Sequence, residues 1–282
     1  MKLTYLPVRG RAEPILLLLI DSNTDFEQEI ITAEDWREMK AKGETGPPRF
    51  PFNGLPTLTF GHGARGGQDT ILAETGAILL FLEGKLAAPG TVQSPPDARA
   101  RLEMVREASA FLLNRLFASA SSSDWLAPPS RQHMLSTLIL PYLTSLSHHL
   151  SSAFFPPLLT PPLTLGQPGS SLSAAAASAC TVISFIEELF PNTLGAGEDG
   201  KMKRRFPLCE ALRVEVESRP RIKAWIEGGG RGVRWTLWEH GSTEWIKQEA
   251  EKYDVEDRAV FGDGKGATVA EAGREAEMDT GV

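Results

Sequence analysis

Tyr5 is the residue whose type and position point most directly to chemistry. It lies in a predicted strand, and the turn at residues 6–11 separates it from an apolar helix. A strand that delivers a phenol to a turn ahead of a helix N-terminus sets a weak acid beside a positive dipole end, which suits the stabilisation of an anion. A small nucleophile such as a thiolate, taken from a bound cosubstrate, fits that place. The alternative is that Tyr5 is a half-buried packing residue.

The other residue types that carry chemistry are few and scattered. Cys180 and Cys209 form no Cys-x-x-Cys pair and have no histidine pattern nearby, so neither a zinc site nor a disulfide framework is expected. We interpret both as small buried hydrophobic residues. The five histidines show no metal spacing. We therefore expect no metal.

Composition limits the class of protein. The 282 residues suit two domains better than one, and 41% of them are hydrophobic, which is ample for real cores. The formal net charge of −7 argues against a general nucleic-acid surface. The longest apolar run, residues 15–20, is too short to span a bilayer and makes a poor signal peptide. We expect a cytoplasmic, reducing setting, with neither nucleic acid nor membrane as partner.

The first 86 residues predict a β-α-β unit followed by two strands and a helix. Residues 2–6 and 26–31 are the strands of the unit, and residues 16–20 supply the helix between them. Residues 32–52 are predicted to be irregular. The remaining elements are strands at 55–60 and 69–72, a glycine-rich turn at 61–67 and a helix from about 74 to 86. This order is typical of a thioredoxin-like domain.

After a linker at residues 87–96, apolar residues recur only at helical spacing, which predicts an all-helical second domain. Pro141 is expected to kink its helix or to begin a new one. Two low-complexity loops, residues 119–130 and 154–173, are interpreted as surface excursions. Residues 231–282 form a third, acidic region with three tryptophans and an end that is predicted to be disordered. The helical spacing covers residues 102–116, 135–150, 182–189, 208–216 and 222–226.

The order of these elements and several short segments together resemble the cytosolic glutathione transferases. The resemblance is closest to the tyrosine-type classes called pi, mu, alpha and sigma, and to related fungal members. It covers residues 1–86 strongly and about 95–228 loosely, but not 231–282. The matching segments are residues 3–14, with Tyr-x-Pro-x-Arg-Gly-Arg-Ala-Glu, then 31–36, 51–56, 73–82, Phe206-Pro207 and 219–224.

This resemblance implies an α/β plus all-α fold. A thioredoxin-like, glutathione-binding domain would span residues 1–86, an all-helical domain 95–230, and an acidic, partly disordered extension 231–282. The implied enzyme is a homodimeric glutathione S-transferase that joins the thiolate of its cosubstrate, glutathione, to small hydrophobic electrophiles. A glutathione-dependent isomerase or peroxidase of the sigma type is one alternative, and a non-catalytic glutathione- or ligand-binding protein is another.

By the same resemblance, Tyr5 is the catalytic, thiol-activating residue. A free thiol has a pKa of about 8.5, and lowering it to near 7 takes about 2 kcal/mol. A hydrogen bond to a charged acceptor contributes about 1.5–3 kcal/mol, and a nearby helix N-terminus adds about 0.3–1 kcal/mol. The phenol of Tyr5 and the helix that begins near Arg11 therefore suffice without a metal or a general base.

The resemblance also assigns residues to the backbone and to the γ-glutamyl end of glutathione. Leu55 and Pro56, a pair with a cis proline in the family, would face the cysteinyl backbone. Glu74 would pair with the γ-glutamyl ammonium, and Thr75 would bind the γ-glutamyl carboxylate at a helix N-terminus. Both residues also fit an ordinary helix cap. Arg11 resembles a family arginine near this end, and its alternative is a structural ion pair with an acid of the second domain.

Trp36 and a cation after it would hold the glycyl carboxylate. Lys42 fits best by its spacing from Trp36, and Lys40 and Arg49 are the alternatives. A lysine in a loop is, however, more often merely solvated.

The electrophile would lie in an apolar pocket beside the thiol. Leu6 and Val8 flank Tyr5 and are its expected floor, and residues 114–121 are its expected opposite wall.

The sequence departs from the family pattern in the core helix of the second domain. The family carries a Ser/Thr-x-x-Asp capping box there, whereas the matching stretch here has Ser173 but Ala176 in place of the acid. Ser173 would then cap the helix alone, at a cost of about 1 kcal/mol. A family acid from the partner subunit also aligns with Phe111, with Glu107 one turn away, so Glu74 would have to compensate.

Overall fold

The structure is a computed structural model that describes residues 1–61, 69–86, 95–121, 125, 127–151, 172–190 and 206–232. The strands are β1 (Lys2–Tyr5), β2 (Glu27–Ile30), β3 (Thr57–Phe60) and β4 (Thr70–Ala73). The helices of the first half are α1 (Glu13–Asp21), α2 (Ala33–Ala41) and α3 (Thr75–Leu86). The helices of the second half are α4 (Pro96–Ala120), α5 (Pro128–His133), α6 (Leu140–Ser151), α7 (Ala174–Leu189), α8 (Pro207–Ser218) and α9 (Pro220–Glu227).

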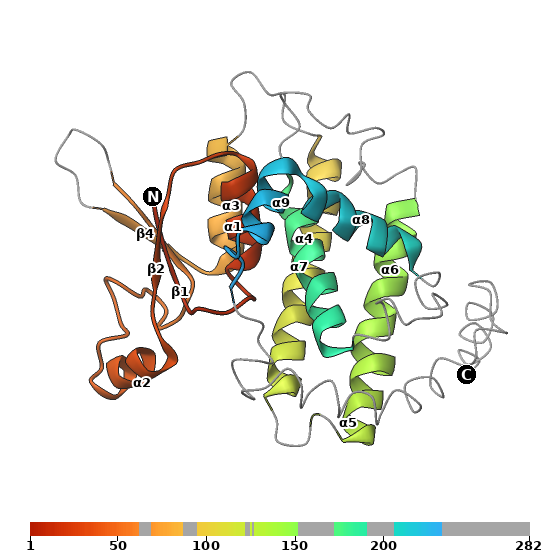
Figure 1. The fold of residues 1–282 in the computed structure, drawn as a ribbon, viewed down its shortest axis with the longest axis horizontal. Coiled ribbons are helices and arrows are strands. Elements are labelled where there is room, and N and C mark those ends of the chain that lie inside the picture. The colour runs from red at the N-terminus through yellow and green to blue at the C-terminus, as the bar shows by residue number, and fades with distance from the viewer. Residues whose placement is uncertain are drawn as a thin grey trace.

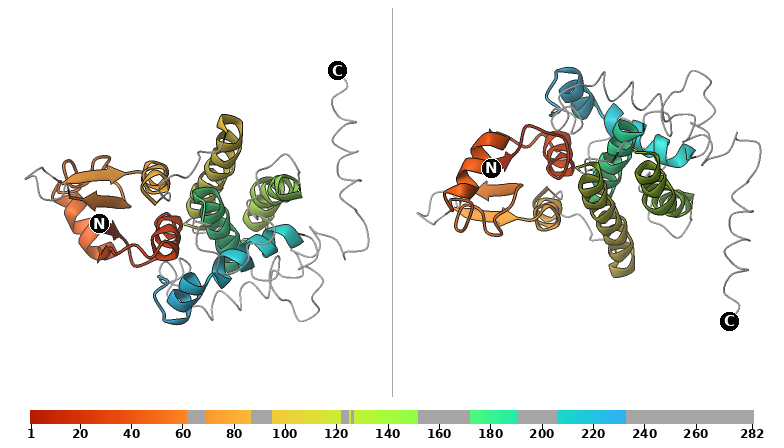
Figure 2. Two further views of the ribbon diagram at one scale, coloured as in Figure 1. Left: turned by 90° about the horizontal axis from the view of Figure 1, so that it is seen from above. Right: turned by 90° about the horizontal axis from the view of Figure 1, so that it is seen from below.

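The four strands form one sheet in the order β2-β1-β3-β4. β1 and β2 run parallel, with Tyr5 opposite Ile30, and both other pairs are antiparallel. The predicted β-α-β unit and the two later strands are thereby confirmed. Figure 1 shows α1 and α3 lying between the sheet and the helices of the second half. The views of Figure 2 show the same layers, so the fold is a thioredoxin-like half followed by an all-helical half, as predicted.

Two helices, α1 and α7, form the centre of the molecule. Residues 15–19 of α1 are all buried, so the helix is apolar all round and must be covered on every side. α7 packs against both α1 and α4, and every residue of α7 except Glu187 is buried. Its first turns are built from alanine and serine, which let neighbouring backbones approach closely. The core of each half therefore depends on the other half.

The prediction that residues 32–52 are irregular is wrong for its first part, which forms α2. Thr32 caps this helix by accepting the N–H of Asp35 at 3.1 Å, and Glu34 and Asp35 lie in the first turn, where acids are favoured. No residue of α2 is buried. A helix without a buried face shows no apolar periodicity, which is why the pattern missed it.

Pro141 lies at the second position of α6, as the expectation of a new helix start requires. It lacks an N–H, and its ring clashes with the carbonyl four residues earlier. The preceding segment, Met134–Ile139, is π-helical and joins α5 to α6 with wider turns.

The loop expected on the surface at residues 119–130 is shorter and less exposed than predicted. α4 continues to Ala120, α5 begins at Pro128, and Trp125 between them is only 2% exposed. Most of the other predicted loop, residues 154–171, lies outside the described residues, as do residues 233–282. The proposed domain boundaries stay a prediction.

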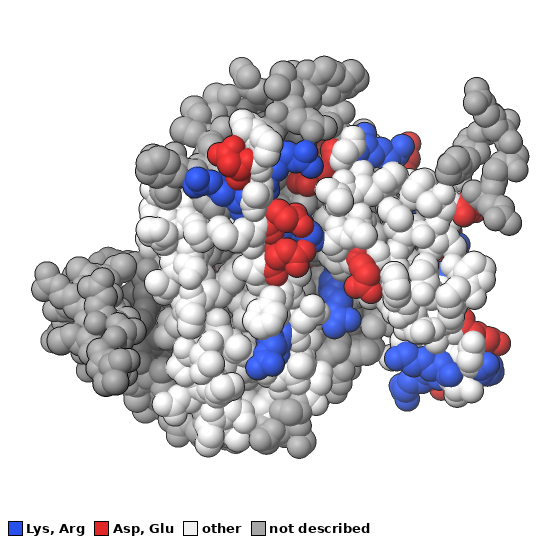
Figure 3. Space-filling view, turned by 180° about the vertical axis from the view of Figure 1, so that it is seen from behind, with Lys and Arg blue, Asp and Glu red and all other residues white. Residues whose placement is uncertain are grey.

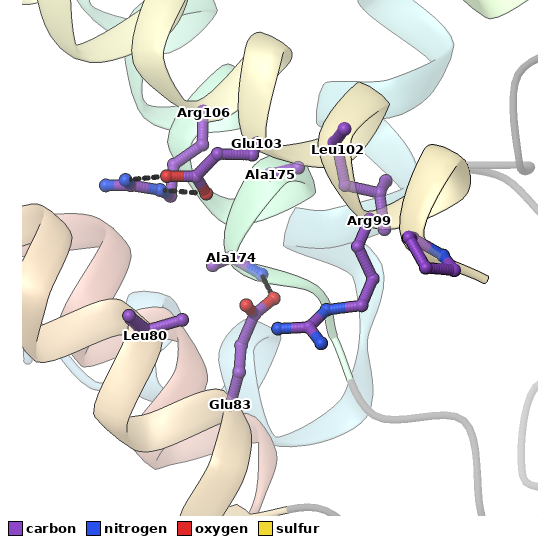
Figure 4. Close-up of a pocket in the computed structure, with 10 residues that line it drawn as sticks. Leu80, Glu83, Arg99, Leu102, Glu103, Arg106, Ala174 and Ala175 are labelled. Carbon is purple, nitrogen blue, oxygen red and sulfur yellow. Dashed lines mark hydrogen bonds and ion pairs between the residues drawn. The ribbon is translucent and has the colours of Figure 1, made fainter. Parts of the chain in front are cut away.

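The N-terminus of α7 is capped from two directions. Ser173 accepts the N–H of Ala176 at 3.1 Å, as expected despite the missing acid. Glu83 of α3 accepts the N–H of Ala174 at 2.8 Å, as Figure 4 shows. The expectation that Ser173 caps the helix alone is therefore wrong, because a carboxylate from the first half provides a second acceptor at this helix N-terminus.

Replacing Glu83 should weaken this cap. We expect Glu83→Met to lower the free energy of unfolding by about 1 kcal/mol, because one N–H of α7 loses a charged acceptor. Urea denaturation followed by circular dichroism measures this. Glu227→Met, which changes a glutamate that is 66% exposed at the end of α9, is the control and should change stability by less than about 0.5 kcal/mol. Equal effects of the two substitutions would contradict the capping role.

Candidate functional site

The hydroxyl of Tyr5 lies at the end of β1, beside the turn that leads into α1. Its oxygen accepts the backbone N–H of Arg11 at 3.2 Å, two residues before the first residue of α1. The side chain is buried, and burial raises the pKa of Tyr5 to about 12, although the charge of Arg11 and its N–H act in the other direction. Tyr5 is therefore a neutral O–H donor whose oxygen already has a backbone partner.

Gly10 lets this turn approach α4. A Cβ on Gly10 would lie 2.5 Å from Cζ of Phe117 and 3.2 Å from the hydroxyl of Tyr5, and the φ of Gly10 is +150°. Any side chain would therefore push the turn away from the Phe117 ring.

A cavity of about 420 Å³ opens beside Tyr5. We call it the tyrosine cavity. One wall is formed by the C-terminal half of α4, through residues at helical spacing, and the other by α2 and the loop before β3. The lining includes Tyr5, Leu6, Arg11, Trp36, Lys40, Asn53, Leu55, Asn114, Phe117, Ala118 and Ser121.

Trp36 and Lys40 lie one helical turn apart on α2 and face this cavity together. The ammonium of Lys40 lies 5.6 Å from the centre of the Trp36 ring, which is within the range of a cation–π contact. The Trp36 ring in turn meets Phe50 edge to face, with centroids 5.0 Å apart. An indole and a cation on one helix face are well placed to bind a carboxylate.

A second cavity, of about 680 Å³, adjoins the first, and we call it the helix cavity because it opens at the N-terminus of α3. Both cavities include Arg11, Leu55 and Asn114 in their lining. Glu74 lines the helix cavity with a φ of +67°, a backbone conformation that non-glycine residues seldom adopt outside functional sites. Thr75 begins α3 and donates its hydroxyl to the carbonyl of Arg11 at 3.2 Å.

The structure brings most of the predicted site residues together. The bond between Leu55 and Pro56 is cis, and both residues line the helix cavity. Arg11 forms no ion pair with an acid of the second half among the described contacts. Its Nε donates to Oδ1 of Asn114 at 2.8 Å, and its guanidinium lies 5.9 Å from the centre of the Phe117 ring.

Two predicted residues lie elsewhere. Lys42 lines neither cavity, and its exposed ammonium contacts Glu38 at 3.3 Å, whereas the alternative Lys40 lines the tyrosine cavity. Val8 is buried and does not line the tyrosine cavity; it lines a third cavity, which Tyr5 and Leu6 also line.

Asn114 begins the stretch 114–121 that was expected to form the opposite wall, but its contact with Arg11 and the place of Asn53 in the lining were not predicted. The only available signal was that Asn114, Phe117, Ala118 and Ser121 recur at the three- and four-residue spacing of one helix face.

Neither cysteine can supply a thiolate. Cys180 and Cys209 are both free and buried, and burial raises the pKa of the Cys209 thiol to about 11 and that of Cys180 further. In the described part of the chain, no three His, Cys, Asp or Glu side chains are grouped as metal ligands would be. Nor does any helix there combine the length and the apolar character needed to cross a bilayer.

The surface charges are mixed rather than segregated. On the face shown in Figure 3, acidic and basic side chains of the described residues lie among one another, without a broad basic area. This mixed surface matches the net charge of −7 and differs from the uniformly positive surface that binds nucleic acid.

Comparison with known proteins relates the sequence to glutathione S-transferases. The chain is 37% identical over 89 residues to a glutathione S-transferase of Dirofilaria immitis, a match that covers 32% of this chain and 36% of the relative. It is 26% identical over 232 residues to human glutathione S-transferase A3, covering 81% of this chain and 88% of the relative. Matches to two pi-type proteins of Xenopus laevis and Caenorhabditis elegans span 43% and 33% of their length, so the more identical region is little more than a third of each protein. No family model matches the chain.

Solved structures relate the fold to the same group. A sigma-class glutathione transferase of Fasciola hepatica has a TM-score of 0.61 at 17% identity, covering 80% of this chain and 95% of that one. A prostaglandin synthase D of Nilaparvata lugens has a TM-score of 0.57 at 19% identity, covering 80% and 96%. At these identities the likeness concerns the fold alone. The sequence relatives and the fold therefore agree in making the chain similar to the cytosolic glutathione transferases.

Proposed function

We propose that this protein is an enzyme that joins the thiolate of glutathione to small hydrophobic electrophiles, with Tyr5 stabilising the thiolate. The observation that carries the proposal is the state of Tyr5. Its hydroxyl is held neutral by burial, accepts an N–H from Arg11, and faces a cavity large enough for a ligand. Such a hydroxyl still has its own hydrogen to donate to a sulfur anion.

Glutathione would lie across the two adjoining cavities. Its γ-glutamyl end would enter the helix cavity, where Glu74 can pair with the ammonium and the N-terminus of α3 at Thr75 favours the carboxylate. The backbone of Leu55, a residue that lines both cavities, would pair with the cysteinyl part. This arrangement directs the thiol towards Tyr5.

The glycyl end would lie against α2. Trp36 and Lys40 line the tyrosine cavity, and Lys40 is the cation that we assign to the glycyl carboxylate in place of Lys42. The electrophile would occupy the apolar part of the same cavity, beside Leu6 and Phe117.

We also propose that the protein acts as a homodimer. Three large apolar side chains are exposed on neighbouring helices, Leu80 of α3 at 58%, Met104 of α4 at 47% and Phe111 of α4 at 66%. Met104 and Phe111 are seven residues apart and so share one face of α4. A second copy of the chain would cover this face.

The role of Tyr5 predicts the behaviour of Tyr5→Phe. We expect the variant to bind glutathione, but the pKa of the bound thiol should return from near 7 towards 8.5, and turnover at pH 7 should fall about tenfold. The ultraviolet absorbance of the thiolate, titrated with pH, measures this directly. In the parent protein turnover should rise with pH and level off once the thiol is ionised, without a fall from Tyr5, whose pKa is about 12.

Tyr142→Phe is the matched control, because Tyr142 is a tyrosine that contacts Ser109 at 2.8 Å and lines neither cavity. It should leave the thiol pKa unchanged. An unaltered thiolate fraction and turnover in Tyr5→Phe would remove Tyr5 from the mechanism. Assays of conjugation, isomerisation and peroxide reduction separate the two enzymatic alternatives, and absence of a thiolate in the parent protein would favour a non-catalytic binder.

The assignment of the glycyl carboxylate is tested by two lysine variants. Lys40→Met should raise KM for glutathione about fivefold, the effect of losing an exposed charge-assisted contact of about 1 kcal/mol, with little change in kcat. Lys42→Met should leave KM unchanged. The opposite result, with Lys42→Met weakening binding and Lys40→Met not, would restore the assignment that spacing alone favours.

The proposed dimer is tested by Phe111→Asp. A charge in an apolar interface should shift the protein to monomers, as measured by sedimentation at micromolar concentration. Val214→Asp introduces the same charge at an apolar residue that is 49% exposed on α8, away from this face, and should leave the assembly intact. A parent protein that sediments as a monomer would refute the dimer.

A further inference from the structure

Charged side chains that proteins rarely bury gather where the turn between β1 and α1 meets the segment after α9. Glu13, in the first turn of α1, is 3% exposed and accepts hydrogen bonds from Arg9 at 3.0 Å and from Nε of Arg231 at 2.7 Å. Arg231 also donates to Glu217 of α8 at 2.9 Å, and Glu217 accepts the hydroxyl of Ser184 on α7 at 2.9 Å. A continuous set of hydrogen bonds therefore runs from the turn to α8 and α7.

Arg213 extends this set on the α8 side. It donates to Glu217 at 2.7 Å and to Glu210 at 2.6 Å, and it lies 3.2 Å from Glu187 of α7. Glu217 thus has Arg213 on one side and Arg231 on the other. The network is anchored in two helices of the second half.

The pair of Glu13 and Arg231 is ionised. Burial would raise the pKa of the Glu13 carboxyl, but the charges and hydrogen bonds of Arg9 and Arg231 hold it below its usual value. Burial lowers the pKa of Arg231, and Glu13 and Glu217 raise it well above its ordinary value. Each charge is therefore matched at close range.

The backbone after α9 also touches the turn directly. A Cβ on Gly232 would lie 3.0 Å from the carbonyl carbon of Val8 and 3.3 Å from the nitrogen of Arg9. A cavity of about 320 Å³ between the two segments includes Tyr5 and Arg231 in its lining. Figure 1 shows α9 lying beside α1, so the segment that follows α9 starts next to this turn.

The contact between Arg231 and Glu13 lies two residues from Arg11, whose N–H donates to the Tyr5 oxygen. Glu13 lies two residues after Arg11, and the charge of Glu13 raises the pKa of Tyr5. Arg231 offsets that charge. Removal of Arg231 would leave a less compensated carboxylate near Tyr5, the proposed partner of the thiolate, and a second negative charge disfavours ionisation of a thiol.

Stability alone does not account for such a pair. Replacing a buried ion pair by apolar residues of similar size often leaves stability unchanged or higher, whereas fixing one arrangement among several is a recognised use of buried charges. Here the arrangement that is fixed is that of the turn beside Tyr5.

We propose that Arg231, acting through Glu13, is a positioning residue for thiolate formation. It holds the turn so that the Arg11 N–H meets the Tyr5 oxygen, and it neutralises the Glu13 carboxylate, which lines the third cavity together with Tyr5. The thiol proton leaves to solvent, and the S⁻ that remains accepts the Tyr5 O–H. The inference rests on the proposed function, and it gives the start of the C-terminal region, residues 231–232, a part in the chemistry.

The test compares the pKa of the bound glutathione thiol in Arg231→Met with that in Arg219→Met. Arg219 is the matched control, because it pairs with Asp21 at the other end of α1, at 2.6 and 2.8 Å, away from Tyr5. Both variants should lose thermal stability. Only Arg231→Met should raise the thiol pKa, by about 0.5–1 unit, and lower kcat at pH 7 about three- to tenfold, with KM for glutathione little changed.

Arg231→Lys, which keeps the charge, should restore most of the thiolate. Arg231→Gln, which keeps N–H donors towards Glu13 but loses the charge, should give a smaller shift of the same sign as Arg231→Met, so the test remains if Arg231→Met fails to fold. An unshifted thiol pKa in Arg231→Met, or an equal shift in Arg219→Met, would overturn the positioning role while leaving the proposed function standing. Absence of a thiolate in the parent protein would overturn both.

Discussion

The site depends on one residue, Arg11, being fixed at three points. Its N–H meets the hydroxyl of Tyr5, its carbonyl accepts the hydroxyl of Thr75, and its guanidinium donates to Asn114. These partners belong to β1, α3 and α4, so the two cavities keep their relative position only while Arg11 keeps its own. A turn without regular secondary structure acquires by these contacts the rigidity that an active site needs.

Further contacts with the second half fix the helix that follows this turn. α1, which follows the turn, is tied to the second half at both ends: Glu13 meets Arg231 at its start, and Asp21 meets Arg219 at its end. Asp21 also accepts the N–H of Leu172 at 3.1 Å, just ahead of α7. The apolar packing of α1 on α7 forms a buried surface between the two halves. The charged contacts at the ends of α1 fix its position along that surface.

Local sequence was enough for the parts of the protein whose signals are local. The β-α-β unit, the start of α6 next to Pro141 and the cap at Ser173 follow from neighbouring residues. The site could be predicted where a segment carries its own motif, as at Tyr5 and at Glu74-Thr75. α2 was missed because it buries nothing. The choice between Lys40 and Lys42 depends on which side of that helix faces the cavity, and the acceptor that Glu83 offers to Ala174 joins residues 91 positions apart.

The burial of residues 13–19 of α1 has a consequence for how such a protein can change over evolutionary time. Residues 15–19 are buried on all sides. Without the helical half, the thioredoxin-like half would therefore expose an uncharged, apolar helix face to water. The two halves are therefore not interchangeable modules. A protein that acquired a different helical half would need matching substitutions in α1 at the same time. Recombination at residues 87–94 alone would therefore give a chain that aggregates.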